Sequence, residues 1–297
     1  MNTFLSLTKR NVKMFFKDKG MFFTSLITPI ILLVLYATFL AKIYRDSFAS
    51  ALPEGFTIDE KLISATVGGQ LMSSLLAVSC VTVSFCANLL MVQDKVNGAR
   101  KDMLVTPVRR SVVASSYYVG TLLTTVIVSF VATGACFIYL AINGWYLSFG
   151  DVMLIILDVV ILTMFGTALA SVVNVFLTSS GQASAVGTVV SAGYGFICGA
   201  YMPINQFGSG LQKVLSLLPG TYGTSLIRNH CLGGVFREMS AVGFPSEAVE
   251  GIKESIDCNI SFFGNTVSIG AMYAVILGAT ALLIGAFVLI NVLRKRV

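Results

Sequence analysis

Charged residues are scarce in this sequence. Asp, Glu, Lys and Arg make up 11% of its 297 residues, whereas soluble domains average roughly 25%. A soluble fold of this size would not have enough charge to cover its surface. The composition therefore excludes a cytosolic enzyme, a disordered chain and a nucleic-acid-binding module, although the net charge is +6.

Residues and motifs for metal or nucleotide chemistry are also missing. The single histidine, His230, has no second histidine or acidic cluster at metal-ligand spacing, so we predict no metal site and a plain polar surface role for it. The sequence has neither the phosphate loop G-x-x-x-x-G-K-[ST] nor the zinc-protease motif H-E-x-x-H. Six cysteines are too few for a disulfide-rich secreted domain.

Long apolar runs dominate what is present. Hydrophobic residues make up 56% of the chain and the mean hydropathy is +0.85. Six runs reach the roughly 20 residues that a membrane helix needs, at about 21–41, 63–92, 112–141, 152–178, 183–203 and 266–290. We predict an all-α membrane protein in which residues 1–20 form an amphipathic interfacial helix and residues 21–297 form one six-span domain. The first run is too long for a signal peptide and lacks a cleavage site.

Basic residues are distributed unevenly between the two sides of this topology. With six spans, both termini lie on one side, together with 13 of the 20 basic residues and only three acids, Asp18, Asp94 and Asp102. The opposite side carries seven basic and ten acidic residues, in two outer segments at 42–62 and about 204–265. The positive-inside rule therefore predicts cytoplasmic termini in a plasma-membrane protein.

The N-terminal segment has an amphipathic pattern. On a helical wheel, one face carries Phe4, Leu5, Val12, Phe15 and Phe16, and the other carries Lys9, Arg10, Lys13 and Lys17. Such a helix lies in the membrane interface. It acts either as a passive anchor that sets topology or as an element that touches a cytoplasmic partner.

The loop between the second and third runs, residues 93–113, is too elaborate for a simple connector. Gly98 and Pro107 punctuate it, and charged residues surround the apolar segment 103–105. The residue before a proline disfavours helix, so we predict a short helix ending near Thr106. The apolar ridge flanked by charge suits docking to another protein.

This loop resembles the first cytoplasmic loop of type-2 ABC exporter permeases. The positions that match are Asp94, Lys95, Gly98, Met103, Leu104, Thr106, Pro107 and Arg110. Val96 and Lys101 stand where that family usually has acids, and Asp102 is the residue that would replace the second acid. A second match covers 199–228, with Pro203, Leu218, Pro219, Thr221, Tyr222 and Arg228.

The resemblance implies a pair of six-span permease subunits, each docked on a separate ATP-binding subunit. The Thr-Pro loop and the N-terminal helix would form that contact, and the segment between the fifth and sixth spans would be external or re-entrant. ATP and Mg would bind to the partner, and this chain would bind no cofactor of its own. Its other partners would be a second permease subunit, identical or different, and membrane lipid, without nucleic acid.

The resembled family lines its central cavity with spans two and five. On that basis the expected substrate path comprises Ser73, Ser84, Phe85, Asn88, Ser191, Tyr194 and Phe196. The alternative for span two is hydrogen bonding between helices. The alternative for span five, whose small residues recur every fourth position from Ala183 to Gly199, is close helix packing.

Three further residues carry sequence-level predictions. Asp158 is the only acid inside a span, and intramembrane acids are functional candidates by default. Its alternative is contact with interfacial water or with Ser or Tyr of span three. Cys231 and Cys258 fall in the outer segment, where we predict a disulfide between them.

The leading hypothesis is a permease subunit of an ATP-driven exporter that works by alternating access. Its substrate would be an amphipathic drug, a peptide, or a lipid-linked or polysaccharide-type molecule. The runner-up is an ion-coupled secondary transporter, which needs intramembrane charges and has only Asp158. An intramembrane protease is disfavoured because His230 lies outside the runs.

Overall fold

The computed structural model describes residues 3–36, 41–42, 45 and 59–293. Helices account for most of them. In chain order the elements are α1 (Thr3–Lys17), α2 (Lys19–Leu35), α4 (Glu60–Val96), α5 (Ala99–Val105), α6 (Arg110–Asn143), α7 (Phe149–Phe176), α8 (Ser180–Ile197), the 3₁₀ turn η2 (Ile204–Gln206), α9 (Ser209–Leu215), α10 (Pro219–Ala241), α11 (Ser246–Ser255), β1 (Ser261–Phe262), β2 (Asn265–Thr266) and α12 (Ile269–Leu293). The two short strands pair antiparallel.

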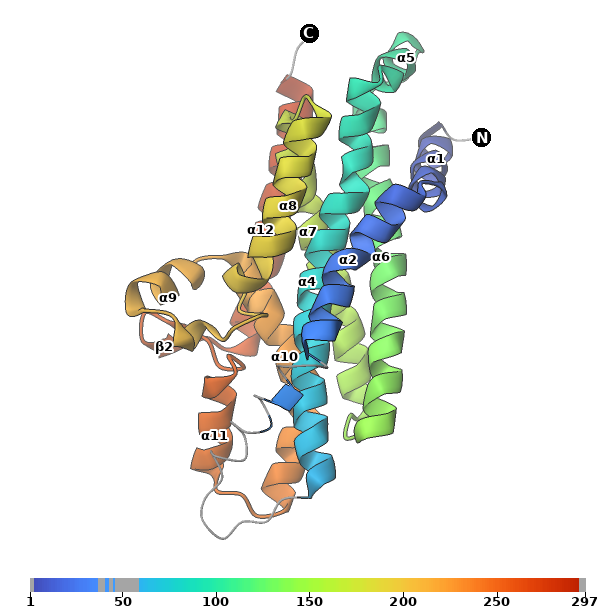
Figure 1. Ribbon diagram of the computed structural model, residues 1–297. Helices are drawn as coiled ribbons and strands as arrows, with labels where there is room; N and C mark the ends of the chain where they lie inside the picture. Colours follow the sequence, from blue (N-terminus) through green and yellow to red (C-terminus); the bar gives the residue numbers. More distant parts are fainter. Residues whose placement is uncertain (1–2, 37–40, 43–44, 46–58, 294–297) are drawn as a thin grey trace.

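The long helices form an elongated bundle with α4 at its centre (Figure 1). Every residue of α4 from 65 to 88 is buried, because α2, α6, α7, α8 and α10 all pack against it. Its 37 residues span about 55 Å at 1.5 Å per residue. That length exceeds a hydrocarbon layer of about 30 Å, so α4 extends beyond it.

Among the described residues, four helices are long and apolar enough to cross a membrane, namely α4, α6, α7 and α12. The all-helical membrane class predicted from the sequence is therefore confirmed. The first predicted span corresponds to the 17-residue α2, and its end lies outside the described residues, as does most of the outer segment 42–62. The fifth corresponds to α8, which ends at Ile197, six residues before the predicted limit.

The first two helices are separate because of Asp18. This residue has extended backbone angles, and its side chain accepts a hydrogen bond from the Met21 amide, which caps α2. Helix α1 therefore turns away from α2. In Figure 1, α1 is seen nearly along its own axis while the long helices run from top to bottom, so α1 lies across the bundle.

The region predicted as an external segment, 204–265, is built differently from that prediction. Its longest helix, α10, is inserted into the bundle, where it packs against α4, α7 and α12. Most of its residues are buried, including Arg228 and His230. The sequence scan missed α10 because polar residues in this helix interrupt the apolar run.

The two ends of the bundle differ. Helix α5, the start of α1 and the end of α12 lie at one end, called here the α5 end, whereas α11 lies toward the other (Figure 1). Helix α5 projects farther out than α1 does.

Candidate functional site

The short helix α5 at the tip of the bundle ends where the sequence predicted, just before Thr106. Gly98 precedes it with a φ of 82°, in the left-handed region that glycine adopts at little cost. Thr106 ends it in an extended conformation before Pro107, and the Thr106 hydroxyl donates to the Met103 carbonyl over 2.6 Å. Local sequence therefore determines the limits of α5.

The apolar ridge of α5 is narrower than predicted. Val105 is 86% exposed, whereas Met103 and Leu104 are half-buried and pack against an apolar cluster that includes Phe15. Asp102, Thr106, Pro107 and Arg110 are exposed around the tip, together with Lys101 and Arg109. The surface available for docking is thus a single apolar tip surrounded mainly by basic residues.

Asp94, the first residue of the matched loop, points inward. Its carboxylate forms a bidentate ion pair with Arg10 of α1, with one contact of 3.0 Å, and accepts a hydrogen bond of 2.6 Å from the Tyr117 hydroxyl of α6. The hydrogen bond to Asp94 raises the pKa of Arg10. We call Arg10, Asp94 and Tyr117 the Asp94 cluster, and it ties α1 to the end of α4 just before α5.

Lys95 has a different internal role. Its ammonium group donates to three backbone carbonyls at the end of α7, those of Asn174, Val175 and Leu177, over 3.2, 2.7 and 3.1 Å. A cation at this position satisfies carbonyls that have no partner within the helix and favours the negative end of its dipole. Asp94 and Lys95 therefore connect the base of α5 to α1 and α7.

The four residues of α4 assigned to the substrate path are inside the chain. Asn88 donates to the hydroxyls of Thr121 and Ser171, each over 3.1 Å, and accepts from Asn174 over 3.1 Å. The Ser84 hydroxyl donates to the Cys80 carbonyl over 2.7 Å. Ser73 donates to the Gln70 carbonyl over 2.8 Å, and Phe85 is buried. Asn88 thus forms hydrogen bonds between helices, the alternative that the sequence left open, whereas Ser73 and Ser84 donate within α4.

The path residues of α8 divide between two environments. Tyr194 is buried, Ser191 is half-buried and Phe196 is 51% exposed. The Phe196 ring meets the edge of Tyr201, with 5.1 Å between ring centroids. Of the seven predicted path residues, Ser191 and Phe196 are therefore the two with side chains on the surface of the described chain.

A scan against protein-family models matches residues 2–231 to the model described as ABC-2 type transporter. The chain belongs to the ABC-2 type transporter family. The match covers more than half of the sequence, from α1 into α10, and includes the Asp94 cluster and α5. A comparison with curated proteins finds no match.

In this ABC-2 chain, hydroxyl and amide side chains line the contact between α4, α6 and α7. They are buried and recur about every fourth residue: Ser84 and Asn88 on α4, Thr121, Thr125 and Ser129 on α6, and Thr163, Thr167, Ser171 and Asn174 on α7. A direct contact of 3.3 Å joins the Ser84 and Thr167 hydroxyls. The same four-residue spacing of polar side chains is present in the sequences of α6 and α7, so these residues could have been predicted from the sequence.

Asp158 of α7 lies in a buried polar group with His230 of α10 and Tyr273 of α12. His230 Nδ1 is 2.5 Å from one carboxylate oxygen, and the Tyr273 hydroxyl donates to the other over 2.5 Å. The prediction that His230 is a surface residue was wrong, since it is 8% exposed. Span three was also the wrong partner for Asp158, because α10 and α12 are the helices that reach it.

Arg228, the closing residue of the second matched stretch, joins three segments that are distant in sequence. Its guanidinium donates to the carbonyls of Ile256 and Gly199 over 2.6 and 2.8 Å and lies 3.7 Å from the Asp257 carboxylate. Asp257 in turn accepts from the Ile204 amide over 2.5 Å. Arg228 therefore fixes the end of α8 against the end of α11.

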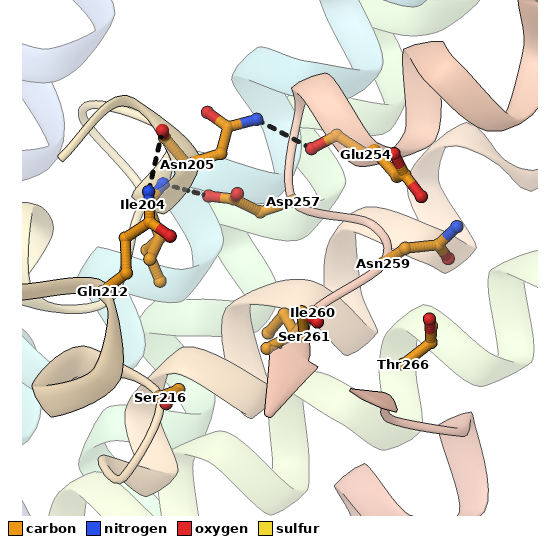
Figure 2. Close-up of a pocket in the computed structure, with 10 residues that line it drawn as sticks. All are labelled: Ile204, Asn205, Gln212, Ser216, Glu254, Asp257, Asn259, Ile260, Ser261 and Thr266. Atoms are coloured by element: carbon orange, nitrogen blue, oxygen red, sulfur yellow. Dashed lines mark hydrogen bonds between the residues drawn. The ribbon is translucent and has the colours of Figure 1, made fainter. Parts of the chain in front are cut away.

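A cavity of about 300 Å³ lies beside this junction. Figure 2 shows its polar lining, in which Asn205 reaches the Glu254 carbonyl over 2.9 Å and Ile204 contacts Asp257. Gln212 lines the same cavity and donates to the Asn205 carbonyl over 3.0 Å. These contacts join η2 and α9 to the end of α11, so the outer segment is a packed part of the ABC-2 chain.

The predicted disulfide between Cys231 and Cys258 is not present in the structure. All six cysteines are free, and these two are each 1% exposed. Cys231 packs in the central core, and Cys258 packs in a second cluster with residues of α11. The prediction was based on an exposed outer loop, whereas the insertion of α10 buries both thiols.

We expect Cys231 and Cys258 to resist maleimide labelling in the folded chain, because neither thiol is accessible to the reagent. Mass spectrometry should count no label at these positions before denaturation and labels at both after it. A Val105→Cys variant is the positive control and should label at once. Rapid labelling of either native thiol, or recovery of a cross-linked peptide pair, would contradict the burial of this region.

No metal centre emerges from the described part of the chain. Within it, no group of three or more His, Cys, Asp or Glu side chains is placed to hold a metal ion. The polar features of this site are therefore interhelical ties and the exposed tip of α5.

Proposed function

We propose that this ABC-2 chain is the permease subunit of an ATP-driven exporter, with ATP and Mg bound on a separate ATP-binding subunit. The observation that carries the proposal is α5, which projects from one end of the bundle (Figure 1). Val105 of this helix is 86% exposed, and Lys101, Arg109 and Arg110 of the same loop are exposed as well. This projecting loop lies within the segment that matches the ABC-2 family model, and its exposed apolar and basic side chains suit docking to a partner subunit.

The contacts behind α5 support a way of transmitting movement. Lys95 holds the end of α7, and Asp94 holds α1 through Arg10. A push on α5 by closure of the ATP-binding subunits is therefore expected to move α7 and α1 together with α4. This coupling would drive the alternation between inward-facing and outward-facing states.

The remaining parts of the proposal concern topology, assembly and substrate. We infer six spans, with α2 and α8 completing the set, and an N-terminal interfacial helix over 1–20. We also infer a re-entrant region between spans five and six, and cytoplasmic termini in the plasma membrane. A second permease subunit would pack beside this one. The exposed Phe196 and the half-buried Ser191 of α8 suit a wall that faces an amphipathic substrate.

The decisive experiment is purification of the tagged chain from its native membrane. We expect a chain with a phosphate loop to co-purify, and ATP hydrolysis to require that chain. The isolated permease should hydrolyse no ATP, because its sequence lacks the motif that cradles phosphates. ATP hydrolysis by the rigorously purified permease alone would exclude the proposal that a separate subunit hydrolyses ATP.

A further inference from the structure

The outward face of α1 combines positive charge with apolar side chains. Lys9, Lys13 and Lys17 are exposed and recur every fourth residue, so they form one stripe. Leu5 is 59% exposed beside them, and Met14 is 40% exposed. These side chains border a shallow hollow of about 530 Å³ that runs along the helix.

The opposite face of α1 is already occupied by the bundle. Thr8, Asn11 and Phe15 are buried, and Asn11 donates to the Ser116 hydroxyl of α6 over 3.5 Å. Gly120 of α6 permits this approach, since a Cβ atom there would stand 2.8 Å from Asn11 Cβ. Packing on α6 therefore turns the lysine stripe away from the protein.

The three lysines have no carboxylate partner among the described residues. Helix α1 contains no acid, and Asp18 beyond it is engaged in capping α2. Arg10, the remaining cation of the helix, turns inward to Asp94. The stripe thus presents three positive charges that the described part of the chain does not neutralise.

Position and composition together restrict what covers this face. If this face were fully in water, burial of Leu5 and Met14 would contribute no stabilisation. If it lay in the hydrocarbon layer, three charged groups would be buried there at a high free-energy cost. Helix α1 also lies across the bundle and nearer its middle than α5 does (Figure 1). The boundary between headgroups and acyl chains suits both kinds of side chain.

We propose that the outward face of α1 binds the phosphate groups of anionic lipids, with Lys9, Lys13 and Lys17 on the headgroups and Leu5 and Met14 among the first acyl carbons. Each lysine near an anionic leaflet contributes about 1 kcal/mol of binding free energy, which corresponds to a roughly fivefold change in affinity. The inference does not depend on ATP-driven transport, since it concerns the isolated chain.

The test uses the full chain in detergent with an environment-sensitive dye on a Thr3→Cys variant. Thr3 is exposed at the start of α1, and the native cysteines are all buried. Titration with phosphatidylglycerol should shift the dye emission to the blue, whereas phosphatidylcholine should not. Raising the salt concentration should weaken the response, because screening shortens the range of the attraction.

Lysine variants test whether the stripe is responsible. Single Lys→Gln changes at positions 9, 13 and 17 should each raise the half-saturating lipid concentration roughly fivefold, and the triple change should raise it on the order of a hundredfold. Lys213→Gln on α9, an exposed lysine of another region, is the matched control and should have no effect.

Two results would overturn the proposal. One is equal binding of the neutral and the anionic lipid, or an unchanged titration in the triple variant. The other is competition by inorganic phosphate at millimolar concentration with no preference for anionic lipid, which would identify a site for small anions. Because the assay contains no ATP-binding subunit, either result leaves the proposed transport function untouched.

Discussion

An Arg228→Ala variant is expected to lose about 3–5 kcal/mol of unfolding free energy, the usual cost of removing one partner of a buried ion pair. The change leaves the Asp257 carboxylate unpaired and frees the carbonyls of Gly199 and Ile256. Thermal or denaturant unfolding in detergent measures the loss. Arg228→Lys should recover only part of it, because one ammonium does not reproduce the two-pronged contact.

The stability of the Arg228→Ala variant should also depend on pH. Burial raises the pKa of Asp257, and Arg228 opposes that rise. Without Arg228 the folded-state pKa lies further above the unfolded value, so stability is lost as pH rises through the folded-state pKa. The deficit of Arg228→Ala relative to the unmodified chain should therefore be smaller at pH 5 than at pH 8.

Arg237→Ala is the matched control for this prediction. Arg237 lies on the same helix and pairs with Asp151, but its side chain is 56% exposed. Solvent reaches the Arg237 guanidinium, and the buried Asp151 carboxylate keeps its hydrogen bonds to Ser148 when Arg237 is removed. This variant should therefore lose much less unfolding free energy than Arg228→Ala. Equal losses of unfolding free energy in the two arginine variants would contradict the prediction that the buried contacts of Arg228 contribute more to stability.

A Val105→Asp variant should abolish coupling to the ATP-binding subunit while leaving the fold intact. Central anchors of an interface commonly contribute 2 kcal/mol or more, so stimulated hydrolysis and export should fall by about 30-fold or more. Val105 makes little contact within the chain, and exposed substitutions usually change stability by within about 0.5 kcal/mol. Transport assays in vesicles and an unfolding curve on the same preparation separate the two effects.

Val242→Asp provides the comparison for Val105→Asp. Val242 is 53% exposed just after α10, remote from α5 in the fold (Figure 1). It should leave coupling unchanged. Met103 and Leu104 are less suitable than Val105 for this purpose, since they are half-buried and an acid there would also disturb the cluster beneath α5. Normal export by Val105→Asp would exclude the tip of α5 as the docking point.

Local patterns predicted the elements whose determinants lie close together in the chain. The end of α5 was predicted from the Thr106-Pro107 pair, and the structure confirms it. The long spans α6, α7 and α12 follow from uninterrupted apolar runs, because lipid leaves no partner for free backbone groups. These features needed no tertiary information.

Contacts between segments that are distant in the sequence could not be predicted from local patterns. Helix α10 contains Arg228, His230 and Arg237, and these polar residues hide it from a search for apolar runs. In the fold they are satisfied by partners on other elements, namely backbone carbonyls for Arg228, Asp158 for His230 and Asp151 for Arg237. The disulfide between Cys231 and Cys258 was predicted for the same reason, because α10 was not recognised as a helix of the bundle.

The sequence alone determined that this is an all-helical membrane protein with an ABC-2 loop motif and no phosphate loop, because composition, run length and motif spacing are local properties. The tertiary structure decided which side of each motif faces outward. It turned Asp94 and Lys95 inward as ties to α1 and α7, left Val105 as the exposed tip, and enclosed Asn88 in hydrogen bonds. The physical reason is that burial and hydrogen bonding depend on which helices pack together, and spacing along one helix does not specify its neighbours.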